Sequence, residues 1–337
     1  MPTEGKWIAS FQERPQAADS QGLSDLQALR LRKDLRLMPL QLDARTLLKD
    51  LPELGPVDYT TANACASCTR HEQVTEILPV GGGTVLFGDH DGLRWLHASW
   101  RHSVAVLSQG LDFTDTPPCL LLFGETGDLA HQITLPDPAA WEGFIDLVCR
   151  HRGCWNCLRH GSKPTASVAI PDCPAWLLRE AWCEAGSDQD LDSRLTRVGL
   201  PRLLALRAME GLFTTAIGVP DLATILRELV ATGLPVHVEL GNRHCTEVLE
   251  SPLERFVAGP DGWDIQLSQS VLHLDPTRLD SLWFVVPPGP EKEHHRFEGY
   301  DETGERVLVL SRPLRPDPAT EGDWQRIVGR LEARIPV

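Results

Sequence analysis

The sequence repeats itself at a fixed offset. Leu23 begins LSDLQALR and Leu200 begins LPRLLALR, while the tetrapeptides ETGD and ETGE begin at Glu125 and Glu302, which lie the same distance apart. Matched segments that recur in one order indicate a duplicated structural unit. The chain is therefore expected to contain two copies of a unit of roughly 150 residues, which is an ordinary domain size.

Two further pairs of landmarks lie between and after these segments. HDGLRWLHASW begins at His90 and HLDPTRLDSLW at His273, and Pro-Asp-Pro-Ala precedes both Trp141 and Trp324. The stretch GSKPTASVAIPDCP between the copies is polar and contains proline, as linkers do. The predicted organisation is an N-terminal extension (1–21), a first repeat (22–160), a linker (161–174) and a second repeat (175–337).

Each predicted unit begins with helices, continues with strands and ends with a helix. LSDLQALRLRKDLRL and LDARTLLKDL carry apolar residues at helical intervals, whereas SVAVLSQG and CLLLFGETGD read as short strands. ETGD and ETGE lie between apolar runs and suit hairpin turns with glycine at positive φ. The pattern predicts an α+β fold: a tandem duplication of a unit with an antiparallel β-sheet flanked by helices.

The charge balance argues against two classes of partner. With 32 Lys and Arg against 47 Asp and Glu, the net charge is −15, and such a surface repels nucleic acids and anionic membranes. The apolar runs are strand-sized, too short for membrane insertion, and the first residues lack the apolar core of a signal peptide. We therefore expect a cytoplasmic protein, whose nine cysteines are reduced thiols.

Two Cys-x-x-Cys pairs, Cys65/Cys68 and Cys154/Cys157, are more than chance placement of nine cysteines predicts. Two such pairs have the composition of a tetrahedral four-thiolate zinc site. Neither pair is followed directly by histidine, which excludes a Cys-x-x-Cys-His haem attachment. The hypothesis is a structural zinc site on these four cysteines, with an iron–sulfur cluster or unliganded thiols as open alternatives.

Three histidines flank the cysteine pairs and are reserve metal ligands in this hypothesis: His71, His151 and His160. CWNC lacks the βαβ surroundings of a thioredoxin-like motif, so a redox role is less favoured. The sequence shows no nucleophile elbow and no phosphate-binding loop. Enzymatic activity therefore stays open.

The ordered segments of both repeats resemble a known family. LTRVGLPRLLALRAMEG, HVELGNRHCTEVLESPLERF, DGWDIQLSQSVLHLDPTRLDSLWFVVPP and FEGYDETGERVLVL in the second repeat resemble the cytoplasmic hemin-degrading and haem-trafficking proteins of haem uptake systems. GPVDYTTANACASCTRHE, HDGLRWLHASW and LLLFGETGDLAHQITL extend the resemblance into the first repeat. It implies haem or a related tetrapyrrole as ligand, held between the repeats, and haem importers or haem oxygenases as protein partners in iron acquisition.

The resemblance also implies which residues would face the haem. Family members have an axial histidine seven residues after a tryptophan; here Trp182 is followed at that distance by Gln189. Arg94 occupies the position of the arginine that faces the other side of the iron. Arg202 occupies that of the arginine that contacts a propionate. A carboxamide is a far weaker donor to iron than imidazole, so this site is expected to be degraded or altered.

Other positions of the family's haem site are altered as well. Pro287 stands where the resemblance implies lysine, and Ser311 and Leu314 where it implies tyrosine and arginine, with Arg312 or Arg315 as possible replacements. If haem is bound, other ligands come into question, namely His244, His97, His102 or a cysteine. The sequence thus predicts a haem-utilisation protein; the alternative is a paralogue without haem, stabilised by zinc, that acts as a binding or regulatory module.

Overall fold

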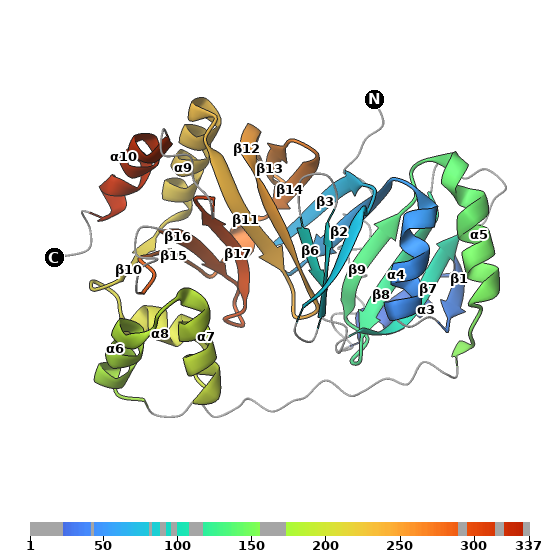
Figure 1. Ribbon diagram of the computed structural model, residues 1–337, viewed down its shortest axis with the longest axis horizontal. Helices are drawn as coiled ribbons and strands as arrows, with labels where there is room; N and C mark the ends of the chain where they lie inside the picture. Colours follow the sequence, from blue (N-terminus) through green and yellow to red (C-terminus); the bar gives the residue numbers. More distant parts are fainter. Residues whose placement is uncertain are drawn as a thin grey trace. The chain divides into compact units, whose positions relative to one another are not determined.

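The computed structural model describes residues 23–41, 44–80, 83–87, 92–95, 100–107, 117–155, 173–288, 295–313 and 320–332 (Figure 1). The predicted N-terminal extension, and the predicted linker up to residue 172, lie outside these ranges. The chain forms two compact units. Unit 1 comprises Met1–Ala62, Ser67–Pro164 and Asn242–Glu247, and unit 2 comprises Asn63–Ala66, Thr165–Gly241 and Val248–Val337.

Unit 1 is built on an antiparallel sheet whose strands lie in the order β1, β7, β8, β9, β2, β3. These strands are β1 (Arg36–Leu40), β2 (Val57–Ala62), β3 (Ala66–Glu72), β7 (Trp100–Leu107), β8 (Cys119–Gly124) and β9 (Leu129–Thr134). A further ladder joins β4 (Glu76–Val80), β5 (Gly83–Phe87) and β6 (Gly92–Trp95). The helices are α3 (Asp25–Arg30), α4 (Ala44–Asp50) and α5 (Trp141–Arg150), with short 3-10 turns at Leu51–Leu54 and Pro138–Ala140.

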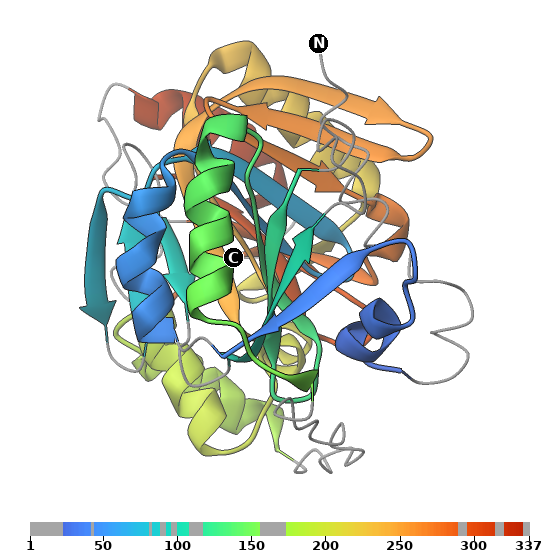
Figure 2. The same ribbon diagram turned by 90° about the vertical axis from the view of Figure 1, so that its right-hand side faces the viewer.

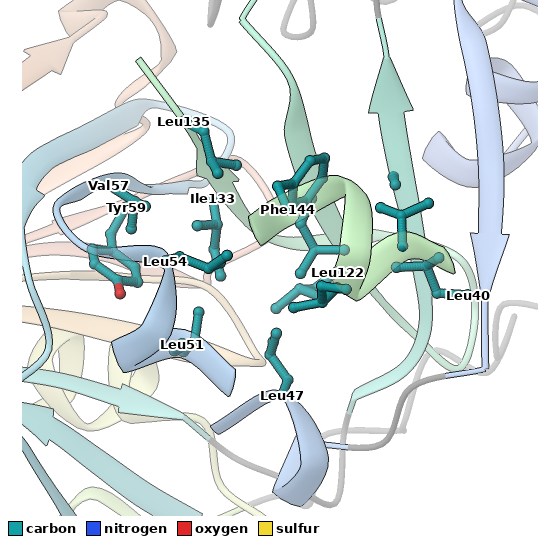
Figure 3. Packing of buried hydrophobic residues seen from close by; sticks show 14 of the residues in the cluster. Leu40, Leu47, Leu51, Leu54, Val57, Tyr59, Leu122, Ile133, Leu135 and Phe144 are labelled. Carbon is teal, nitrogen blue, oxygen red and sulfur yellow. The ribbon is translucent and has the colours of Figure 1, made fainter. Parts of the chain in front are cut away.

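Helices cover both faces of the unit 1 sheet, and the alternation of side chains along β8 shows this directly. Leu120 and Leu122 belong to a core cluster with residues of α4 and α5, such as Leu47 and Phe144 (Figure 3). The intervening Leu121 belongs to a second cluster with residues of α3. All six residues of β8 are buried, as a doubly covered strand requires. In Figure 2, α4 (blue) and α5 (green) lie side by side over the sheet.

Unit 2 repeats this sheet in the order β10, β15, β16, β17, β11. Its strands are β10 (Thr214–Ile217), β11 (Pro235–Gly241), β12 (Cys245–Gly259), β13 (Gly262–Leu267), β14 (Ser270–Leu274), β15 (Ser281–Val285), β16 (Arg296–Tyr300) and β17 (Arg306–Ser311). Its helices are α6 (Ala175–Glu184), α7 (Asp188–Arg197), α8 (Arg202–Ala208), α9 (Val219–Thr232) and α10 (Glu321–Glu332), with a 3-10 turn at Pro276–Arg278.

The predicted fold class is confirmed, and the elements follow the offset found in the sequence. The first residues of α3 and α8 are separated by the same distance along the chain as those of β8 and β16, and as those of β9 and β17. The two predicted hairpin turns contain glycines at positive φ, Gly127 at 81° and Gly304 at 80°. Both turns join the corresponding strands of their units, β8 to β9 and β16 to β17.

Unit 2 also contains α6 and α7, which precede α8 in the chain (Figure 1). Trp182 of α6 is buried and stacks on Phe213 with 5.8 Å between ring centroids. Leu191 and Leu195 of α7 join the same core cluster. This cluster also contains residues of α8 and β15, so the three helices pack together beside the sheet of their own unit.

Two short segments, each beginning with an asparagine, belong to a different unit from the residues on either side of them. Asn63–Ala66 belongs to unit 2, and Asn242–Glu247 belongs to unit 1. Asn242 Nδ2 donates 2.9 Å hydrogen bonds to the carbonyls of Ala62 and Ala130 in unit 1. Asn63 Nδ2 donates to the carbonyls of Gly241 (2.9 Å) and Val307 (2.8 Å) in unit 2. Each asparagine side chain therefore donates to two backbone carbonyls of the unit to which its segment belongs.

We expect Asn242→Ala to lower the free energy of unfolding by about 1–3 kcal/mol, because the carbonyls of the half-buried Ala62 and the buried Ala130 lose a donor. Arg243→Ala is the matched control: its side chain is exposed, and its effect should stay within about 0.5 kcal/mol. Equilibrium denaturation in urea measures both. Equal losses for the two variants would contradict the role given to the asparagine.

Candidate functional site

Gln189, the residue at the predicted axial position, is an exposed residue in the first turn of α7. Ser187 caps this helix, and its hydroxyl accepts a 3.1 Å hydrogen bond from the Asp190 amide. The neighbouring Asp188 is buried. In the first turn of α7, the side chain of Asp188 is thus buried, while that of Gln189 is exposed to solvent.

Arg202, the predicted propionate contact, begins α8 and is surrounded by carboxylates. Its Nε and Nη2 donate to the two oxygens of Glu298 at 2.9 and 2.7 Å, a bidentate pair. Nη2 also donates to Asp188 at 2.7 Å, and Nη1 donates to Asp192 at 2.7 Å. Only 9% of the Arg202 side chain is exposed. The guanidinium is therefore already charge-compensated within unit 2.

Two more arginines complete this cluster. Arg296 Nη1 donates to Asp188 Oδ2 at 2.8 Å, and Arg306 Nη1 lies 3.8 Å from Glu298 Oε2. The Tyr300 hydroxyl donates to Glu298 at 2.6 Å. Three arginines (Arg202, Arg296 and Arg306) thus face three carboxylates (Asp188, Asp192 and Glu298), so the charges balance. We call these six residues the arginine–carboxylate cluster.

Burial and charge act in opposite directions on the carboxylates of the cluster. Burial opposes ionisation of Glu298, but the charges of Arg202 and Arg306 outweigh it and lower its pKa to about 2. For Asp188, burial outweighs the attraction of Arg202 and raises the pKa. Burial and the adjacent Glu298 charge raise the pKa of the Tyr300 hydroxyl, which stays protonated and donates its hydrogen bond.

The structure describes the backbone of Arg94, which lies in β6 and pairs with Val85 of β5. The altered positions of the second repeat are described in part. Pro287 is buried just after β15, and Ser311 is buried at the end of β17. Arg312 is buried and pairs with Glu321 of α10, so it is used within unit 2. Leu314 and Arg315 lie outside the described residues.

The three alternative histidine ligands differ in their surroundings. His244 is buried, and its Nε2 contacts the Asp128 carboxylate in unit 1. Burial would raise the pKa of Asp128, but hydrogen bonds from His244 and Thr126 hold it well below its usual range. His102 is buried in β7, and His97 lies outside the described residues. The Nε2 atom of His244 is therefore already occupied by the Asp128 carboxylate.

The structure describes three of the four predicted zinc ligands, Cys65, Cys68 and Cys154. The Cys65 thiol donates to the Arg278 carbonyl at 3.1 Å, and burial raises its pKa to about 12. Cys68 is buried in β3, opposite Thr61. Cys154 is disulfide-bonded, which corrects the expectation of uniformly reduced cysteines. Cys157 lies outside the described residues.

Zinc binds thiolates, whereas the Cys65 thiol donates a hydrogen bond to a carbonyl and Cys154 is disulfide-bonded. Among the described residues, no group of three or more His, Cys, Asp or Glu is placed to hold a metal ion. The reserve ligands are used elsewhere or not described. His71 Nδ1 lies 2.7 Å from Asp58 and His151 Nε2 lies 3.2 Å from Asp50, while His160 is outside the described residues. The zinc hypothesis therefore has no support in the described residues.

Sequence reasoning missed a buried polar cluster in unit 1. The Thr61 hydroxyl donates to Glu247 at 2.8 Å and lies 2.9 Å from His131 Nδ1. Because a hydroxyl has one proton, Nδ1 of His131 must donate, which defines its tautomer. The Cys245 thiol donates to the Ala130 carbonyl at 3.0 Å. Partners 70 and 186 residues apart along the chain leave no local motif to find.

The burial of His131 makes the stability of the protein depend on pH. Burial, with a smaller contribution from the charge of Arg70, lowers the pKa of His131 to about 3 from the ordinary 6.5. The unfolded chain therefore binds more protons between these pH values, so stability is complete above pH 6.5 and falls as the pH drops. A single group changes the free energy of unfolding by up to about 1.4 kcal/mol per pH unit.

We expect the free energy of unfolding to fall between pH 6.5 and pH 5, with about 1.5 kcal/mol of the loss due to His131. His131→Asn keeps a side-chain nitrogen near Thr61 and should remove this part of the pH dependence. Urea denaturation at the two pH values measures the difference. An unchanged pH dependence in the variant would show that His131 does not carry the effect.

Comparisons with known proteins agree with the fold. Residues 199–331 match the family model described as the haemin-degrading HemS.ChuX domain. Over 335 residues the chain is 21% identical to the hemin transport protein HmuS of Yersinia pestis, covering 92% of this chain and 90% of the relative. Residues 199–331 are thus similar to the HemS.ChuX domain, and the likeness to a hemin transport protein extends over nearly the whole chain.

Solved structures are also similar to nearly the whole chain. The apo form of PhuS, a heme-binding protein from Pseudomonas aeruginosa, superposes with a TM-score of 0.81 at 24% identity, over 96% of both chains. Its holo form gives 0.79 at 25% identity, over 95% of both. The Escherichia coli heme oxygenase ChuS gives 0.76 at 17% identity, over 96% of this chain and 98% of the other. Among the described residues of our chain, every helix is too short or too polar to span a membrane.

Proposed function

We propose that this protein binds haem and takes part in haem utilisation, as a trafficking or degrading protein whose axial position is altered. The observation that carries the proposal is the match to holo-PhuS, which covers 95% of both chains at 25% identity. The match includes both units, so it is not restricted to the half covered by the family model. The duplicated scaffold of haem-binding proteins is therefore the main support.

The proposal that the axial position is altered depends on the identity of residue 189, which is glutamine. The known axial ligands of haem iron in proteins are nitrogen, sulfur or phenolate donors, and a carboxamide is not among them. Gln189 is exposed in the first turn of α7, where an imidazole could reach a ligand without moving the helix. We infer that Gln189 itself contributes little to holding iron, so haem affinity in this chain depends on other contacts.

Arg94 and Arg202 enter the proposal differently. Arg94 remains a proposed contact on the other side of the iron, on the strength of the family resemblance. The hydrogen bonds of Arg202 to Asp188, Asp192 and Glu298 speak against a propionate contact. Haem importers and haem oxygenases remain proposed partners, and a cytoplasmic location remains proposed with them.

A hemin titration tests the proposal. We expect the Soret band to shift and saturate at one equivalent of hemin per chain. Gln189→His should tighten binding by about tenfold or more, because it supplies an imidazole donor. Gln41→His, the same substitution at an exposed position of unit 1, is the control and should leave the affinity unchanged.

Two outcomes would contradict the proposal. Spectra of the wild type and of Gln189→His that both match free hemin would show that the scaffold no longer binds haem. This result would favour the alternative of a paralogue without haem, acting as a binding or regulatory module. Equal gains for the two histidine variants would show that position 189 has no special relation to a haem site.

A further inference from the structure

Asp188, the first residue of α7, is held by arginines from two other elements of unit 2. Its Oδ1 accepts from Arg202 of α8 at 2.7 Å, and its Oδ2 accepts from Arg296 of β16 at 2.8 Å. Only 6% of its side chain is exposed. Both carboxylate oxygens are therefore used, and the backbone at the start of α7 is tied to a helix and to the sheet.

Arg202 has little capacity left for a further anion. Of its five N–H donors, one serves Asp192, one serves Asp188 and two serve Glu298. A propionate brought to this guanidinium would add a negative charge to a buried cluster whose charges already balance. Binding it would require a carboxylate of the cluster to leave, and Glu298 is fully buried.

The corresponding positions of the first repeat show that the cluster accompanies α7. At the offset that relates the two repeats, Arg202 corresponds to Asp25, and Glu298 corresponds to Leu121. Leu121 packs in an apolar cluster with residues of α3. Unit 2, in which α6 and α7 precede the corresponding helix α8, has the charged cluster instead. The arginine–carboxylate cluster is thus found in the unit that contains α7, the helix with which Arg202 pairs.

From these contacts we propose that Asp188 and Arg202 are positioning residues. They fix the first turn of α7, and with it residue 189, while Arg202 makes no contact with a haem propionate. The inference rests on the proposed function, because position 189 matters only if haem is the ligand. It differs from the role that the family resemblance implies for Arg202.

Hydrogen exchange tests the positioning step without any ligand. In Asp188→Asn, which loses the charge held by two arginines, the amides of residues 191–195 in α7 should exchange about tenfold faster or more. Asp264→Asn is the matched control, because Asp264 is an exposed aspartate of unit 2 that pairs with His273. Unchanged α7 exchange in Asp188→Asn would overturn the positioning role.

Hemin and hemin dimethyl ester, whose propionates are blocked, test the role of Arg202. In the Gln189→His background, Arg202→Gln should weaken binding of both porphyrins by the same factor, within about twofold, because the lost contact is internal. A loss seen with hemin and not with the ester would assign Arg202 to a propionate and overturn the inference. If Arg202→Gln does not fold, Asp188→Asn replaces it in the same assay. This variant should also weaken the binding of hemin and of the ester by the same factor.

The two proposals fail in different ways. If neither porphyrin binds to wild type or to Gln189→His, the proposed function is wrong. The hydrogen-exchange comparison still decides whether Asp188 positions α7. If both porphyrins bind and α7 exchange is unchanged in Asp188→Asn, the proposed function stands and the positioning role is wrong.

Discussion

The burial of the Arg202 guanidinium among three carboxylates is the constraint on which the arrangement of unit 2 depends. A buried charge is tolerated only when it is paired and hydrogen-bonded. The partners of Arg202 come from α7 and β16, so moving α7 away would leave opposite charges buried without each other. The three helices α6, α7 and α8 are thus joined to the sheet by electrostatics as well as by the apolar cluster around Trp182.

The two repeats share a scaffold but differ in where they bury polar groups. Unit 2 places charges beside α7 and α8, whereas unit 1 buries Arg70 with Glu72 and Glu247, next to the hydrogen-bonded Thr61 and His131. Duplication supplies two copies of the same strand order, and each copy can then acquire its own buried polar groups. Such groups favour a unique packing when all their hydrogen bonds are made. The repeats therefore differ in their buried polar groups as well as in the helices α6 and α7 of unit 2.

The sequence predicted the duplication, the α+β class and the hairpins at Gly127 and Gly304, because these depend on local patterns of apolar residues and glycine. It did not predict the role of Arg202, since Glu298 is 96 residues away along the chain. The four-cysteine zinc site was inferred from spacing alone, which says nothing of burial or oxidation, and it has no support among the described residues. In the structure the buried Cys65 thiol donates a hydrogen bond to the Arg278 carbonyl, and Cys154 is disulfide-bonded.

The central claim is that Arg202 is satisfied within the protein and positions residue 189, the proposed axial position. A crystal structure of the Gln189→His variant with ferric hemin tests it most directly. The account predicts an imidazole nitrogen on the iron, with Arg202 still bidentate to Glu298 and no propionate oxygen within hydrogen-bonding distance of it. A propionate bound to Arg202, with Glu298 or Asp188 displaced, would contradict the account.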